Sequence, residues 1–180
     1  IASLATTQVA ALTATQIAAL TTTGIEAFGE AQLQALTVTQ IKSLAATQVR
    51  ALTATDVAAF SSTQFASLSA AQIMALTTTA MAGLTADEIA NLTATQTKAL
   101  AVTQIAALSL SQIQAFGAAQ INALSAAQFA SLSSTALAAL STTQLGGLTS
   151  AQIGTLSSTK FGALTADQIN ALTSSQLKGI

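Results

Sequence analysis

The sequence predicts an all-α fold: a solenoid or superhelix of very short helices, one for each eight-residue repeat. A large apolar residue returns every eight positions from Leu4 to Ile180, without a slip. Each octad follows the consensus Leu-[Ser/Thr]-x-x-Gln-[Ile/Val/Leu/Phe]-x-[Ala/Ser], whose Leu is called the first position here. Charges also sort by position within the octad. Because a strict short period is typical of stacked or coiled architectures, we expect residues 1–180 to form a single continuous array.

The first element of each octad is a helix-start signal. In the octad that begins at Leu12, Thr13 and Gln16 have the spacing of a capping box, in which each side chain bonds the other residue's backbone N–H. Leu12 and Ile17 occupy the two positions of a hydrophobic staple. The assigned helix caps in two representative octads are Thr13, Gln16, Thr37 and Gln40.

The second element is a short helix, and the third is a bend. Ala18 and Ala19 extend the helix at little cost, and Leu20 then begins the next start signal. We expect helices of roughly five to seven residues with a sharp bend at every Leu-[Ser/Thr]. Equal bends at equal intervals generate a superhelix, and the small eighth residue lets its turns approach closely. The predicted core comprises Leu12, Ile17, Leu20, Ile25, Phe28, Leu36, Ile41 and Leu44.

The scarce charges agree with short helices, because helix dipoles favour acids at the N-terminus and bases at the C-terminus. Acids in the expected first turns are Glu30, Asp56, Asp87, Glu88 and Asp167, and bases near the expected ends are Lys42, Arg50, Lys98 and Lys178. Only Glu26 and Lys160 depart from this pattern. Residues at the seventh position, such as Lys42 and Arg50, should face water.

One continuous α-helix is the first competing fold. Eight residues at about 100° each advance the chain about 80° beyond two full turns. The first-position residues would therefore spiral around such a helix and leave no stable apolar face. Thr would also recur in mid-helix, where it is unfavourable.

A β-solenoid is the second competing fold and is kept as the alternative. Thr-x-Thr elements such as Thr13/Thr15 suit strands. Leu12 and Ile17 are five residues apart, however, so a strand would point them to opposite faces. Pro is absent, and the nine Gly residues do not occupy one fixed place at which strands could turn.

Composition argues against most chemistry. The 180 residues are 51% apolar and 6% charged, with net charge −1 and no Cys or His. With five Lys and Arg there is no basic patch for nucleic acid, and polar positions interrupt every apolar run well short of the roughly 18 residues of a membrane span. The recurring Ser and Thr have no neighbouring base. We therefore expect no enzyme, cofactor, metal, small-molecule substrate or membrane insertion.

Two hypotheses of function remain. The first is a structural element, a filament, stalk or spacer that associates with copies of itself laterally or end to end. A net charge near zero favours this association, because copies of the chain repel one another only weakly. The alternative is a surface-recognising, ice-binding-like array of Thr. The capping role and the free exchange of Thr for Ala45 or Ala101 count against that alternative. Because the chain begins and ends within a repeat, we expect it to be an excerpt of a longer array.

Three runs carry a resemblance to known proteins: ALTATQIAAL at 11–20, ALTVTQIKSL at 35–44 and ALTADQINAL at 163–172. They resemble the tandem octapeptide tracts of giant, low-complexity bacterial proteins, which are surface-associated, secreted or adhesin-like. This resemblance covers the whole chain and implies a repeat region that is extracellular or at the cell surface. It assigns no functional residue.

Overall fold

A computed structural model describes residues 1–180 and contains 22 short helices and no strand. The all-α prediction is confirmed, and both the β-solenoid and the continuous helix are excluded. The chain forms two compact units, Ile1–Asn91 and Leu92–Ile180. The octad phase runs from Asn91 to Leu92 without a break, and the single continuous array expected over residues 1–180 stays a prediction.

Each octad contributes one helix. The N-terminal unit contains α1 (Thr6–Ala11), α2 (Ala14–Ala18), α3 (Thr22–Glu26), α4 (Glu30–Gln34), α5 (Val38–Ser43), α6 (Ala46–Arg50), α7 (Ala54–Ala58), α8 (Ser62–Ala66), α9 (Ala70–Ala75), α10 (Thr78–Met81) and α11 (Ala86–Ala90). The C-terminal unit contains α12 (Ala94–Ala99), α13 (Val102–Ala106), α14 (Leu110–Ala115), α15 (Ala118–Ala123), α16 (Ala126–Ala130), α17 (Ser134–Ala138), α18 (Thr142–Gly146), α19 (Ser150–Ile153), α20 (Ser158–Phe161), α21 (Ala166–Asn170) and α22 (Ser174–Leu177).

The bend between helices consists of two consecutive extended residues. At the end of α5, Leu44 has φ −59° and ψ 127°, and the next residue, Ala45, has φ −68° and ψ 154°. These angles are close to polyproline II, which any L-residue adopts. No residue has a positive φ. The bends therefore need no glycine, and this is why Gly has no fixed place in the octad.

The helices are four to six residues long, slightly shorter than the five to seven expected. The difference lies at the C-terminal end. In α10, for example, Ala82 keeps helical angles (φ −66°, ψ −21°) but serves as the C-cap, so the helix ends at Met81 after four residues.

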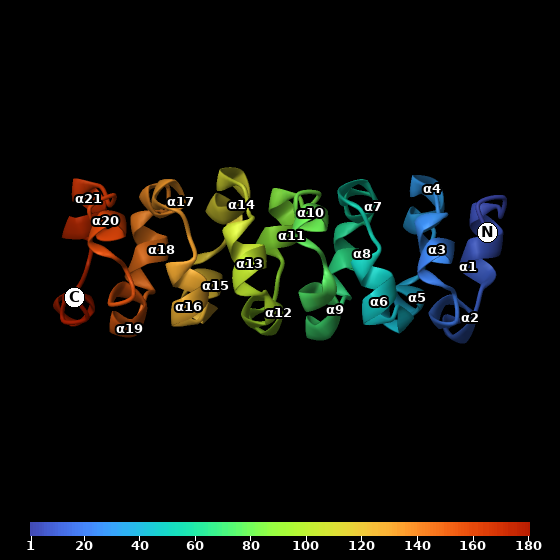
Figure 1. The fold of residues 1–180 in the computed structure, drawn as a ribbon, viewed down its shortest axis with the longest axis horizontal. Helices are drawn as coiled ribbons and strands as arrows, with labels where there is room; N and C mark the ends of the chain where they lie inside the picture. Colours follow the sequence, from blue (N-terminus) through green and yellow to red (C-terminus); the bar gives the residue numbers. More distant parts are fainter. The chain divides into compact units, whose positions relative to one another are not determined.

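Within each unit, a helix packs against the helix three octads further along. Such pairs are α2 with α5, α6 with α9 and α7 with α10 in the N-terminal unit, and α12 with α15 and α15 with α18 in the C-terminal unit. In Figure 1, α4, α7 and α10 accordingly lie along one edge of the N-terminal unit, with α2, α5 and α9 along the other. This periodic packing makes each unit a superhelix of short helices.

The core lies between the short helices and consists mainly of first- and sixth-position side chains. Six of the eight predicted core residues are buried: Ile17, Ile25, Phe28, Leu36, Ile41 and Leu44. The other two, Leu12 and Leu20, are only half-buried. Both belong to the first turn of the N-terminal unit, where a neighbouring turn covers them on one side only.

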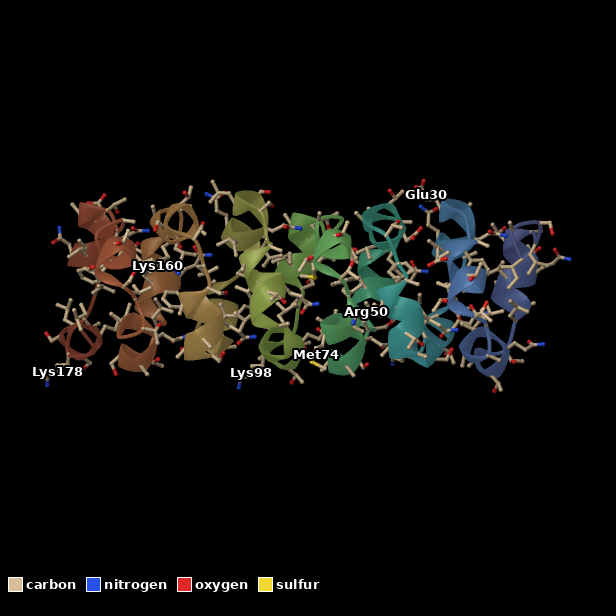
Figure 2. All side chains as sticks on the ribbon, viewed as in Figure 1. Glu30, Arg50, Met74, Lys98, Lys160 and Lys178 are labelled. Carbon is tan, nitrogen blue, oxygen red and sulfur yellow. The ribbon has the colours of Figure 1, made fainter.

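Charged residues follow the helix ends, with one correction. Acids lie in the first turns of α4, α7, α11 and α21, and bases lie in the last turns of α5, α6 and α12. Lys178 is the C-cap of α22. Lys160 was expected to be an exception, but α20 has four residues, so Lys160 lies in its last turn. Figure 2 shows Glu30, Lys98 and Lys178 projecting outward from the ribbon.

None of the 22 helices combines the length and the apolar character that crossing a lipid bilayer requires. The longest helices have six residues.

Candidate functional site

The most unusual feature of the interior is a repeated buried amide. Gln stands at the fifth position of 16 of the 22 octads. Buried polar side chains need hydrogen-bond partners, and a Gln amide offers an acceptor oxygen and two N–H donors. We call this series the glutamine ladder; its buried members are Gln32, Gln40, Gln48, Gln64, Gln72, Gln96, Gln104, Gln112, Gln120, Gln128, Gln144, Gln152, Gln168 and Gln176.

The oxygen of each ladder amide caps its own helix. In α5, the Thr37 N–H donates to Gln40 Oε1 at 2.7 Å, and the Gln40 N–H donates to Thr37 Oγ1 at 3.3 Å. Thr13 and Gln16 make the same pair of bonds at 2.8 and 3.2 Å. The four cap residues assigned from the sequence therefore form two complete capping boxes.

One half of the capping box can be missing, but no octad lacks both halves. Where Ala or Gly stands at the N-cap, the Gln oxygen still accepts the cap N–H, as in the Ala45–Gln48 and Gly117–Gln120 pairs. Where Gln is replaced by a residue without a side-chain acceptor, the cap hydroxyl remains. The Thr77 hydroxyl, for example, accepts from the Ala80 N–H at 3.0 Å.

In eleven ladder residues, the amide nitrogen bonds to the preceding turn of the superhelix within its own unit. Gln40 Nε2 donates to the carbonyl oxygens of Val9 and Leu12, at 2.8 and 2.7 Å. The first of these carbonyls lies at a helix C-terminal end and the second in the bend that follows. Together with the pairing of helices three octads apart, the 28-residue separation, three and a half octads, sets one superhelical turn at between three and four octads.

In both units, the Gln amide bonds to carbonyls that lie 28 and 31 residues earlier in the chain. Carbonyls 28 residues earlier accept at 2.5–2.9 Å from the Nε2 atoms of Gln32, Gln40, Gln48, Gln64, Gln72, Gln120, Gln128, Gln144, Gln152, Gln168 and Gln176. A single side chain thus closes the start of its own helix and satisfies backbone groups of the turn before it. Gln16 belongs to the first turn and is exposed.

Sequence reasoning assigned Gln to capping and missed this second bond. The available signal was the preference for Gln itself. A capping box accepts Glu as readily as Gln, because capping uses only the side-chain oxygen. A position that strongly favours the amide over the carboxylate therefore indicates that an N–H donor is also required.

Six octads carry another residue at the fifth position: Gly24, Asp56, Ala80, Glu88, Ala136 and Lys160. Lys160 keeps the link to the preceding turn, since its Nζ donates to the Ala130 carbonyl 30 residues earlier. Asp56 keeps the cap, accepting from both the N–H and the hydroxyl of Thr53. Glu88 is only 3% exposed, and burial raises the pKa of its carboxyl group.

The surface grooves offer little chemistry. An open groove of about 490 Å³ in the N-terminal unit is lined by small aliphatic and hydroxyl side chains and one amide, which are those of Val38, Ser62, Thr63, Ala66, Ser67 and Asn91. A similar groove of about 410 Å³ in the C-terminal unit is also lined by uncharged residues. No three acidic side chains lie together in a way that could hold a metal ion.

The repeated short helix and the glutamine ladder define a tandem short-repeat protein. Residues 126–158, which contain α16 to α19, match the family model of the ALTTAQ repeat. No curated protein matches the chain.

Proposed function

We propose that this chain is a structural repeat segment, a filament, stalk or spacer built by regular coiling. The glutamine ladder carries the proposal. Each turn presents amide donors on one side and backbone carbonyls on the other, as Gln40 and Gln72 do relative to Leu12 and Leu44. Because this pairing recurs in most octads of both units, an array of this kind gains length with each added octad without needing a new kind of contact.

Self-association is the second part of the proposal. Net charge is −1 over 180 residues, so repulsion between copies is weak. Several large apolar side chains are also exposed, including Met74 at 58%, Val102 at 44% and Leu110 at 43%. Lateral or end-to-end contact between copies would cover such residues. The resemblance to octapeptide tracts of bacterial surface proteins favours a place outside the cell or on its surface.

A length series tests the structural role. Chains with the present 22 octad helices, and with four or eight octads added or removed, would be compared by small-angle X-ray scattering and circular dichroism. We expect helical spectra at every length and a maximum particle dimension that grows linearly with octad number. A dimension that grows with the cube root of chain length would contradict a spacer or filament. Sedimentation at increasing concentration measures association, and a monomer at all concentrations would refute self-assembly.

A Thr-rich, ice-binding-like surface is the second candidate function. Thr39, Thr55 and Thr63, at the fourth position of their octads, are exposed, and the N-caps of their helices use the hydroxyls of Thr37, Thr53 and Ser61 instead. Against this candidate, one turn is not a whole number of octads, so equivalent threonines do not form straight columns. Thermal hysteresis in solution would support it, and freezing without hysteresis would exclude it.

A further inference from the structure

Glu88 occupies a fifth position of the ladder, but its side chain lacks the N–H donors of the Gln amide. Its carboxylate accepts from the Thr85 N–H at 2.8 Å and from the Thr85 hydroxyl at 3.0 Å, so it caps α11 as Gln caps other helices. Only 3% of the residue is exposed. An ionised carboxylate has no proton to donate, and therefore it cannot make the second bond of the ladder.

Two earlier octads of the N-terminal unit show where that second bond would go. Gln64 and Gln72 donate to the carbonyls 28 residues earlier, those of Leu36 and Leu44, at 2.7 and 2.9 Å. The equivalent acceptor for Glu88 is the carbonyl of Phe60, in the bend before α8. Helix α11 packs against α8, which places the two segments on adjacent turns of the N-terminal unit.

This part of the N-terminal unit has little else to replace the missing link. The preceding fifth position holds Ala80, whose side chain has no donor. Ala80 and Glu88 belong to the only two consecutive octads whose fifth position is not Gln. A change in the hydrogen bonding of Glu88 therefore acts where the ladder is already interrupted.

Few charges act on Glu88. Helix α8 contains no titratable residue, and Asp56 is the only one in α7. Desolvation by burial is the largest cause of the raised pKa of Glu88; the hydrogen bonds from the N–H and the hydroxyl of Thr85 lower that pKa, and the charge of the adjacent Asp87 raises it. No cation is among the causes, and Lys98 is the only charged residue between 92 and 118.

We propose that Glu88 is a proton-operated link between superhelical turns. When protonated, its carboxyl O–H donates to the Phe60 carbonyl as the Gln amide does in other octads, while its other oxygen caps α11. Loss of the proton places a negative charge near that carbonyl, breaks the link and loosens the last turn of the N-terminal unit.

The direction of the pH dependence follows from the raised pKa. A group that binds its proton more tightly in the folded state stabilises the fold fully below its unfolded pKa, here near 4.5. That contribution is lost as pH rises through the folded-state pKa. Within this window the unfolding constant increases by up to about tenfold per pH unit.

The test uses the full 180-residue chain. The sequence has three glutamates, Glu26, Glu30 and Glu88, so ¹³C labelling of Glu gives three carboxyl signals to follow from pH 4 to 8. Urea unfolding over the same range, followed by circular dichroism, measures stability. We expect the carboxyl signal of Glu88 to titrate above its ordinary pKa and the urea midpoint of the wild type to fall as pH rises.

Variants separate this link from a general effect of charge. Glu88→Gln should remove the fall and exceed the wild type in stability at pH 8, whereas Glu88→Ala should remove the fall but stay less stable than the wild type at pH 4. Glu26→Gln, which removes an exposed carboxylate from the same unit, should keep the fall. Gln64→Glu should add a second fall. An ordinary titration of Glu88, or a Glu88→Gln variant that keeps the wild-type fall, would overturn the proposal.

Discussion

Gln64 donates its side-chain amide to the carbonyl of Leu36 across 2.7 Å, although 28 residues separate them in the chain. The oxygen of the same amide accepts the Ser61 N–H at 2.8 Å. The residue is 4% exposed, so both bonds are shielded from water. One uncharged side chain thus caps the start of α8 and also bonds to the previous turn of the superhelix.

Removing such an amide should cost more than removing a cap alone. Gln64→Ala leaves the carbonyls of Leu33 and Leu36 without their amide donor, and we expect a loss of about 2–4 kcal/mol in the free energy of unfolding. Gln16→Ala is the matched control, because Gln16 is exposed and its loss should cost only about 0.5–1 kcal/mol. Urea unfolding measures both, and equal losses would show that the inter-turn bonds contribute nothing.

Because two turns approach closely at Gly83, we expect any larger residue at this position to destabilise the fold. A Cβ at this position would overlap the backbone carbonyl group of Ala54, which begins α7 on the neighbouring turn. We expect Gly83→Ala to destabilise the chain by about 1–3 kcal/mol. At Gly146 an added Cβ meets nothing within 4 Å, so Gly146→Ala should instead stabilise α18 by about 0.5–1 kcal/mol. Opposite signs in thermal or urea unfolding are the expected result.

The hydroxyl of Thr97 is buried without a partner. Thr97 occupies a sixth position, where nearly all octads place an apolar side chain, and it is fully buried. Thr97→Val keeps the shape and removes the unsatisfied hydroxyl, and we expect a gain of about 1 kcal/mol in the free energy of unfolding. Thr97→Ser keeps the hydroxyl and loses a methyl group, so it should be destabilising. A Val variant less stable than the wild type would contradict this assignment.

The octad phase should matter more than chain length. Deleting residues 61–68 leaves every later Gln facing an equivalent carbonyl, since Gln72 would then meet Leu36 in place of Leu44. Deleting Ser62 alone shifts all later octads by one residue relative to the turns before them. We expect the one-residue deletion to lower the melting temperature more than the eight-residue deletion, and the reverse order would count against the ladder.

Much of the local structure could be predicted from single octads. The start of a helix could be predicted because both partners of the capping box lie within four residues, as in the pairs Thr13–Gln16 and Thr37–Gln40. The charges at helix ends follow equally from short-range electrostatics. The bend was predicted, but not its geometry, which consists of two extended residues without a positive φ.

The sequence by itself determined one helix per octad, the caps, the bends and most of the core, because each depends on interactions within about eight residues. Only the tertiary structure decided how many octads make a turn, which carbonyl each Gln reaches and why Leu12 and Leu20 stay half-buried. These features join residues 28–31 positions apart. The separation results from bend angles that accumulate over several octads, and no single octad contains that information.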